Sequence, residues 1–167
     1  MALREITTFP DNVLRKKAKQ VEVFDDNLQQ LIEDMVVTMR EAPGVGLAAP
    51  QIGVAKRVIV VEFGHESEES IPKQLYVVVN PEIVDRSEKT VEGIEACLSV
   101  PGFAGEVNRS QVVTIRGQDS KGAQIKIRAE GWLARIFQHE IDHVNGVLYT
   151  DRADNLWQPD AEETASI

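Results

Sequence analysis

The feature that most constrains this chain is the run His-Glu-Ile-Asp-His at residues 139–143. Residues four positions apart on a helix project from the same face, about one turn from each other, so His139 and His143 can bind one metal ion. Glu140 stands beside the first histidine, where it can act on a metal-bound water without binding the metal. The pattern predicts a helix that carries a metal site. The alternative is a polar helix face with two surface histidines.

Apolar residues surround this motif on the predicted helix. The helical pattern starts at Gly131 and stops at Asn145-Gly146. Its apolar members are Trp132, Leu133, Ile136, Phe137 and Ile141. Because these positions nearly encircle the helix, we expect it to be buried and central to the fold.

The rest of the chain predicts a second long helix and several strands. Apolar residues at helical spacing follow an N-cap at Asp25 or Asp26, and Pro43-Gly44 ends this helix near Ala42. Segments rich in β-branched residues predict strands at 57–63, 75–84, 111–116 and 124–129. We therefore expect an α+β fold of mostly antiparallel strands around the buried motif helix, with the long helix packed outside.

The length of 167 residues fits a single catalytic domain, which we place over residues 1–167. The sequence contains no linker, repeat or low-complexity run. Small and acidic residues at 157–167 are expected to form a frayed tail. A loop near residues 65–72 contains His65, which we expect to be solvated rather than metal-bound.

The composition excludes several classes of function. With 18 basic and 27 acidic side chains the net charge is −9, so we predict neither nucleic-acid binding nor attachment to an anionic membrane. The apolar runs are too short for a membrane span, and the first residues do not resemble a signal peptide. A single cysteine suits a reducing compartment. The expected location is the bacterial cytoplasm, or an organelle if a presequence has been removed.

A catalytic site of this kind needs a third protein ligand and one open position. Upstream, Cys97 is the only cysteine. The candidates downstream of the motif are Asp151, Asp154, Asp160, Glu162 and Glu163. The last two lie at the spacing used by zinc endopeptidases of the thermolysin kind, but Pro159 argues against an ordered helix there. Cys97 is the better candidate, and the endopeptidase stays as the alternative.

Three segments, in order along the chain, resemble the signature motifs of the peptide deformylase family. They are Gly44-Val45-Gly46-Leu47-Ala48-Ala49-Pro50-Gln51-Ile52-Gly53, Ile94-Glu95-Ala96-Cys97-Leu98-Ser99-Val100-Pro101-Gly102 and Gln138-His139-Glu140-Ile141-Asp142-His143. The resemblance extends over residues 5–152. It implies removal of the formyl group from the formylmethionine that begins new polypeptides, close to the ribosome exit.

The resemblance also implies a metal centre. The ligands of one divalent ion would be Cys97, His139 and His143. The ion implied is Fe²⁺ in the cell, and Zn²⁺, Ni²⁺ or Co²⁺ also suit these ligands. Glu140 would act as the general base and later deliver a proton to the leaving amine. We also expect Asp142 to pair with Arg109 and steady the motif helix.

The remaining matched residues would act on the substrate. Gln51 and the backbone N–H of Leu98 would stabilise the oxyanion, where one donor is typically worth about 2.7–4 kcal/mol. Gly46 would let a peptide backbone approach closely, as an added strand. Val45 and Ile136, with Leu98, would line a narrow apolar slot for the methionine side chain.

The chain departs from the family pattern at two positions. Ala96 replaces the usual glycine before the cysteine, where a methyl group narrows the cleft or excludes some backbone conformations. Ala104 stands where an arginine often follows the Pro-Gly pair; if that arginine binds the peptide, substrate affinity should be lower here. A non-catalytic or redox-sensing metal module is a further alternative, but Glu140 argues against it, since a closed structural site needs no base.

Overall fold

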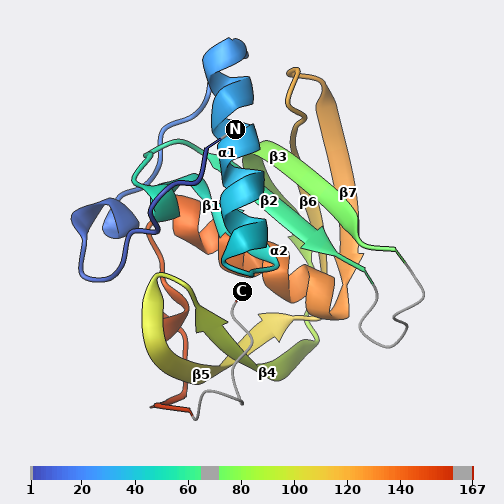
Figure 1. Cartoon of the computed structure of the whole chain (residues 1–167). Coiled ribbons are helices and arrows are strands. Elements are labelled where there is room, and N and C mark those ends of the chain that lie inside the picture. Colours follow the sequence, from blue (N-terminus) through green and yellow to red (C-terminus); the bar gives the residue numbers. More distant parts are fainter. Residues whose placement is uncertain (1, 65–71, 160–166) are drawn as a thin grey trace.

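The computed structural model describes residues 2–64, 72–159 and 167 (Figure 1). The described elements, with η for a 3₁₀ helix, are η1 (Asn12–Arg15), α1 (Asp26–Glu41), β1 (Gly46–Ala48), η2 (Ala49–Ile52), β2 (Val58–Phe63), β3 (Gln74–Arg86), β4 (Thr90–Cys97), β5 (Val100–Ser110), β6 (Val112–Gln118), β7 (Gln124–Glu130), α2 (Gly131–Val144), η3 (Tyr149–Asp151) and β8 (Asn155–Trp157). The predicted α+β class is confirmed, and both long helices and all four predicted strands are present.

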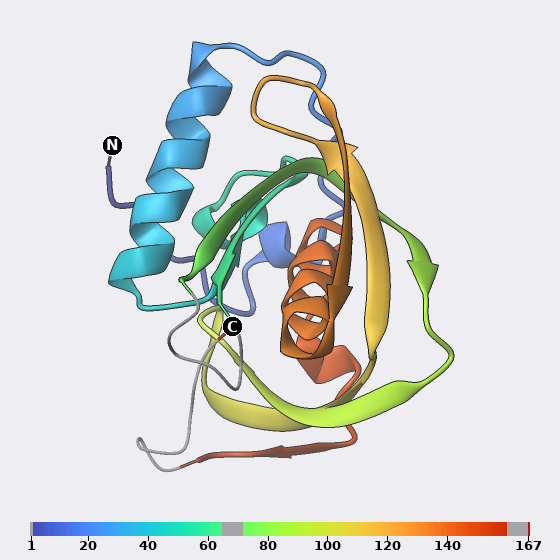
Figure 2. The ribbon, with the colours of Figure 1, turned by 90° about the vertical axis from the view of Figure 1, so that its right-hand side faces the viewer.

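The strands form two antiparallel sheets. The large sheet has the order β1-β2-β3-β6-β7, and the small sheet has the order β4-β5-β8. Figure 2 shows α2 enclosed by strands of both sheets. Within the described chain, β1 and β4 are edge strands, because each is paired along one side only. These two edges flank the region where α2 carries the motif.

Strand β2 separates two apolar cores. Successive side chains of a strand point to opposite faces of its sheet. Val58 and Val60 therefore pack with the α1 side chains, whereas Ile59 and Val61 pack with those of α2. All four are fully buried, which explains why this strand is a continuous apolar run. Helix α2 is buried as predicted, and α1 covers the other face.

The helices begin and end where the local sequence predicts. Asp25 caps α1, since its carboxylate accepts a hydrogen bond from the Leu28 N–H at 3.0 Å. Helix α2 ends at Val144, and Asn145 and Gly146 follow it. Gly146 has φ 78°, and a Cβ at this position would lie 2.6 Å from the carbonyl oxygen of Arg15. A glycine is required here both by the backbone and by the contact with η1.

Strands β1, β4, β5 and β8 were not predicted. Two residues of the predicted tail at 157–167 have backbone partners in the described chain. Trp157 lies opposite Ala104 across β8 and β5. Ile167 is buried, and its N–H donates to the carbonyl oxygen of Ala96 at 2.9 Å. The expectations for His65 and for residues 160–166 lie outside the described residues.

Replacing Gly146 with alanine should lower the free energy of unfolding more than the same change at Gly102. The φ angles are 78° and 85°, so both alanines incur the roughly 1–2 kcal/mol cost of left-handed backbone. At Gly146 the added methyl group would meet a backbone atom. At Gly102 no described atom lies within 4 Å of the position that the methyl group would take. Urea denaturation measures both. Equal losses would contradict the close packing of η1 on the end of α2.

Candidate metal centre

Three donor atoms meet where α2 passes the end of β4. Cys97 Sγ lies 3.4 Å from His143 Nε2, which lies 3.3 Å from His139 Nε2. A tetrahedral ion with zinc-like bond lengths would separate two such nitrogens by about 3.3 Å, and a nitrogen from a sulfur by about 3.6 Å. The three side chains are buried, and together they form a group able to hold a metal ion. The donors fit a metal with one further position open.

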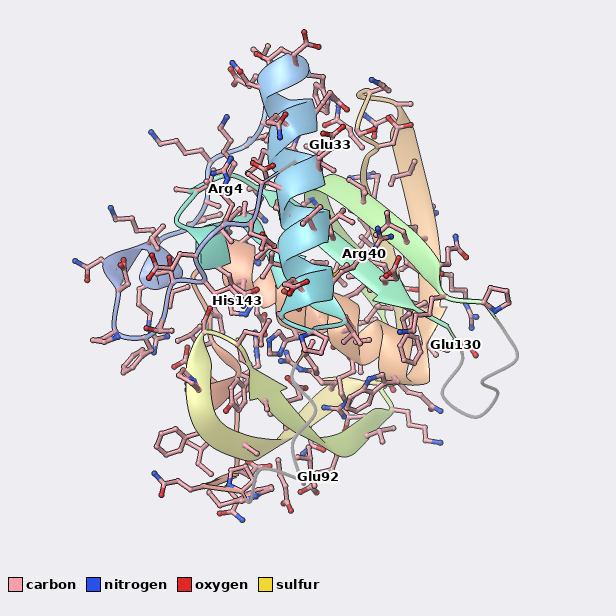
Figure 3. The ribbon with its side chains drawn as sticks, viewed as in Figure 1. Arg4, Glu33, Arg40, Glu92, Glu130 and His143 are labelled. Carbon is pink, nitrogen blue, oxygen red and sulfur yellow. The ribbon has the colours of Figure 1, made fainter. Side chains whose placement is uncertain are left out.

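The three donors come from the two elements that face each other across the site. Figure 3 places His143 on α2, between that helix and the small sheet. His139 Nδ1 lies 2.8 Å from Glu95 Oε1, so Nδ1–H donates to this carboxylate and Nε2 is free to bind a metal. Burial opposes the charged form of His139, but its hydrogen bonds to Cys97 and Glu95 raise its pKa to about 10. Burial and the neighbouring charge of His139 lower the pKa of His143 well below its usual value, so the two imidazoles do not carry positive charge together.

A buried network of charges surrounds Glu95, which is fully buried. Arg109 donates to it through Nε and Nη2 at 2.9 and 2.8 Å, and Arg135 donates at 2.7 Å. Burial opposes ionisation of Glu95, yet Arg109 and His139 hold its pKa well below the usual range. Arg109 also donates to Asp142 at 2.6 Å, as we expected, and this pair is buried rather than solvated.

Glu140 is fully buried, and neither of its carboxylate oxygens has a hydrogen-bond partner among the described residues. Burial raises its pKa to about 7, although the charge of His139 acts in the opposite direction. A Cβ on Gly46 would lie 2.5 Å from Glu140 Oε2, so the carboxylate lies against the backbone of β1. A carboxylate of this kind can exchange a proton near neutral pH.

Gln51 lies beside Cys97, with its amide held at both ends. Its Oε1 accepts from the Ala48 N–H at 3.0 Å, and its Nε2 donates to Ser99 Oγ at 3.2 Å. The same Nε2 lies 3.5 Å from Cys97 Sγ. Leu98 follows Cys97 directly. The structure thus brings Gln51 of η2 to the expected ligand Cys97, and Leu98 is the neighbour of that cysteine in the sequence.

Two of the three expected slot residues, Val45 and Ile136, belong to one apolar cluster of the described chain, and Leu98 is not among its members. Ile136 is fully buried in it, and Val45 and Trp132 pack against it. Of the downstream ligand candidates, Asp151 pairs instead with Arg15 at 2.5 Å, and Glu162 and Glu163 lie outside the described residues.

Four buried side chains around the three donors were not predicted from the sequence. They are Glu95, Ser99, Arg135 and Tyr149. The ring of Tyr149 stacks on His139, with a centroid distance of 6.0 Å and an interplanar angle of 21°. Glu95 lies two positions before Cys97, but the register of β4 with β5 shifts between these residues, so simple strand alternation gave no reliable signal for it.

Both departures from the family pattern fall at buried positions. Ala96 is 3% exposed, and its carbonyl oxygen accepts the Ile167 N–H. Ala104 is 1% exposed and lies opposite Trp157 of β8. A small residue therefore stands at a covered position in this chain, where an arginine is common in the family.

Replacing Glu95 with glutamine should weaken metal binding about 10–100-fold, the effect typical of losing a residue that orients a metal-bound histidine. The matched control is Glu82→Gln, since Glu82 is exposed and its ion pair in the described chain is with Arg116 on the protein surface. Titration of metal-free protein against a chromogenic chelator gives the affinity, and circular dichroism verifies the fold. An affinity equal to that of the parent would show that Glu95 does not orient His139.

A buried site that combines metal ligands, one open position and a neighbouring base is characteristic of metal-dependent hydrolases. Comparison with known proteins defines the class further. The chain belongs to the polypeptide deformylase family, whose sequence profile matches residues 3–158.

Several relatives are similar over most of their length. The peptide deformylase of Symbiobacterium thermophilum is 52% identical over 156 residues, which cover 93% of this chain and 69% of that protein. The crystal structure of peptide deformylase from Thermotoga maritima has a TM-score of 0.85 and 41% identity, over 93% of this chain and all of that one. The Met-Ala-Ser-bound class I type b peptide deformylase of Acinetobacter baumannii has a TM-score of 0.84 and 35% identity, over 90% and 98% of the two chains.

The activity follows from the family. The chain is a metal-dependent hydrolase that removes the formyl group from the N-terminal methionine of formylated polypeptides. The hypothesis of a non-catalytic metal-binding module is therefore wrong, and the alternative of a zinc endopeptidase is not favoured. Among the described residues no helix has the length and apolar character to cross a membrane.

Proposed function

We propose that Cys97, His139 and His143 hold one divalent ion, which is Fe²⁺ in the cell. A thiolate with two imidazoles also suits Zn²⁺, Ni²⁺ and Co²⁺. The observation that supports this proposal most directly is the spacing of the three buried donor atoms, 3.3 and 3.4 Å along the two measured edges. When bound, such an ion supplies a Lewis acid and a strong nucleophile at neutral pH.

Glu140 is the proton carrier of the proposed mechanism. Its carboxylate takes a proton from the attacking water and then delivers it to the nitrogen of the leaving amine. Three observations support this role: its burial, the absence of a partner among the described residues, and a pKa of about 7. Gly46 leaves the space that the carboxylate occupies.

Gln51 Nε2 and the backbone N–H of Leu98 stabilise the negative charge that develops on the formyl oxygen. Ala48 and Ser99 hold the Gln51 amide in place before substrate arrives, which avoids reorganisation during the reaction. The donor Nε2 is 3.5 Å from Cys97 Sγ and is therefore close to the reacting centre.

The peptide substrate binds in extended form between the edges of β1 and β4, with Gly46 on one side. Its methionine side chain enters the slot lined by Val45 and Ile136. Two observations support this arrangement. The Ala96 carbonyl already accepts an N–H from extended chain, that of Ile167. The A. baumannii relative, of similar fold, binds the peptide Met-Ala-Ser.

We place the enzyme in the bacterial cytoplasm, where it acts on nascent polypeptides close to the ribosome exit. The compared sequence relative comes from a bacterium. The net charge of −9 argues that the enzyme meets its substrates there without binding ribosomal RNA directly.

Replacing Glu140 with alanine should leave metal content unchanged and lower the turnover of formyl-Met-Ala-Ser by the roughly 10²–10⁴-fold typical of a general acid–base residue. The same variant should be more stable, because it removes a buried polar group whose unmet hydrogen bonds cost about 1–3 kcal/mol. The control is Glu33→Ala, on the exposed face of α1 (Figure 3). Turnover within about threefold of the parent, far short of an acid–base contribution, would rule out the role of Glu140.

Replacing Gln51 with leucine should lower kcat by about 10²–10³-fold, the usual effect of losing one oxyanion donor. The Michaelis constant should change little, because the amide acts on the transition state rather than on the bound substrate. Steady-state kinetics on metal-loaded protein separate the two parameters, and metal analysis verifies that Cys97 still binds. A raised Michaelis constant with an unchanged kcat would assign Gln51 to substrate binding instead.

A further inference from the structure

Ile167 contacts the strand edge and the apolar cluster that the proposed function assigns to the substrate. We propose that Ile167 acts as an internal competitor, whose seated side chain blocks the methionine slot and whose withdrawal admits the formylated peptide. The inference rests on the slot described above, but it concerns access to the slot and not the chemistry beside it.

The backbone of Ile167 pairs with the edge that the substrate is proposed to use. Its N–H donates to the carbonyl oxygen of Ala96 at 2.9 Å, and Ala96 immediately precedes the ligand Cys97. In the described chain the other edge of β4 is taken by β5. A backbone hydrogen bond to a free strand edge is the way in which extended peptides add to a sheet. Ile167 therefore makes a substrate-like contact.

The side chain of Ile167 is buried in the apolar cluster to which Ile136 belongs. It is 1% exposed, and it belongs to the apolar cluster that contains Ile136 and against which Val45 packs. Isoleucine and methionine are similar in volume and polarity, so a slot that accepts one can hold the other. In both Figure 1 and Figure 2 the end of the chain lies within the outline of the molecule, beside the small sheet.

The strand β8 keeps this competitor near the site. Trp157 pairs with Ala104 of β5, and β5 pairs in turn with β4, so the chain leaves β8 within the small sheet. Ile167 follows Trp157 by ten positions in the sequence, and a covalent link of this length gives an effective concentration of the order of millimolar. Even a weak contact is then substantially populated. It raises the Michaelis constant in inverse proportion to the fraction of open sites and leaves kcat unchanged, because only the open sites can bind substrate.

The test compares three metal-loaded variants with the parent enzyme. Ile167→Asp places a charge in the apolar slot, Ile167→Met keeps an apolar side chain, and Val23→Asp makes the same kind of change at a residue that is 65% exposed. With formyl-Met-Ala-Ser, Ile167→Asp should lower the Michaelis constant about fivefold, as expected if the slot is open about one fifth of the time. Its kcat should equal that of the parent, and the other two variants should behave like the parent.

Inhibition by the product Met-Ala-Ser supplies an independent readout. Because a competitor affects every ligand of the slot alike, the inhibition constant should fall in Ile167→Asp by the same factor as the Michaelis constant. Unchanged constants, or a change in kcat instead, would overturn the proposal. If the parent enzyme bound metal but did not deformylate, that result would contradict the proposed function. Calorimetry of Met-Ala-Ser binding to the same variants would then still test whether Ile167 blocks the slot.

Discussion

The carboxylate of Glu95 is the group on which the rest of the site depends. It lies on β4 and accepts hydrogen bonds from Arg109 of β5 and from Arg135 and His139 of α2. All four side chains are at least nine-tenths buried, so removing any one would leave uncompensated charge in a dry environment. The same contacts fix the small sheet against α2 and orient the ring of His139. Folding and metal-site geometry are thus determined by one set of interactions.

Helix α2 carries many polar side chains for a buried helix. Groups on the two surrounding sheets supply hydrogen-bond partners for them. Gln138, for example, exchanges hydrogen bonds with the backbone of Ser110 in both directions. Buried polar groups are stable when such partners satisfy them. Two residues of α2 are exceptions in the described chain, because neither oxygen of Glu140 finds a partner and His143 Nδ1 has none either. An unsatisfied carboxylate opposes folding, yet it is also the form of a glutamate best suited to carry protons near neutral pH.

The elements that the sequence analysis missed have a common physical reason. Strands β4 and β5 contain glycines that lower strand propensity but that packing requires. A Cβ on Gly93 would lie 2.7 Å from Arg135 Cζ, and one on Gly105 would lie 2.8 Å from Leu156 Cδ2. These glycines make room for side chains from α2 and β8. These contacts join residues that are far apart in the sequence, so a short stretch of sequence does not indicate them. The strands that were predicted could be recognised from their own runs of apolar residues.

The sequence by itself determined the helix that carries His139, Glu140 and His143, since donor chemistry and helical spacing are local properties. The motifs also indicated Cys97 as the third ligand and the family to which the chain belongs. Only the tertiary structure decided how Glu95 gathers its partners and that Ile167 lies on the edge of β4. The first depends on side chains from three separate elements. The second is a backbone hydrogen bond, which any residue with an N–H can form and which therefore leaves no mark in the sequence.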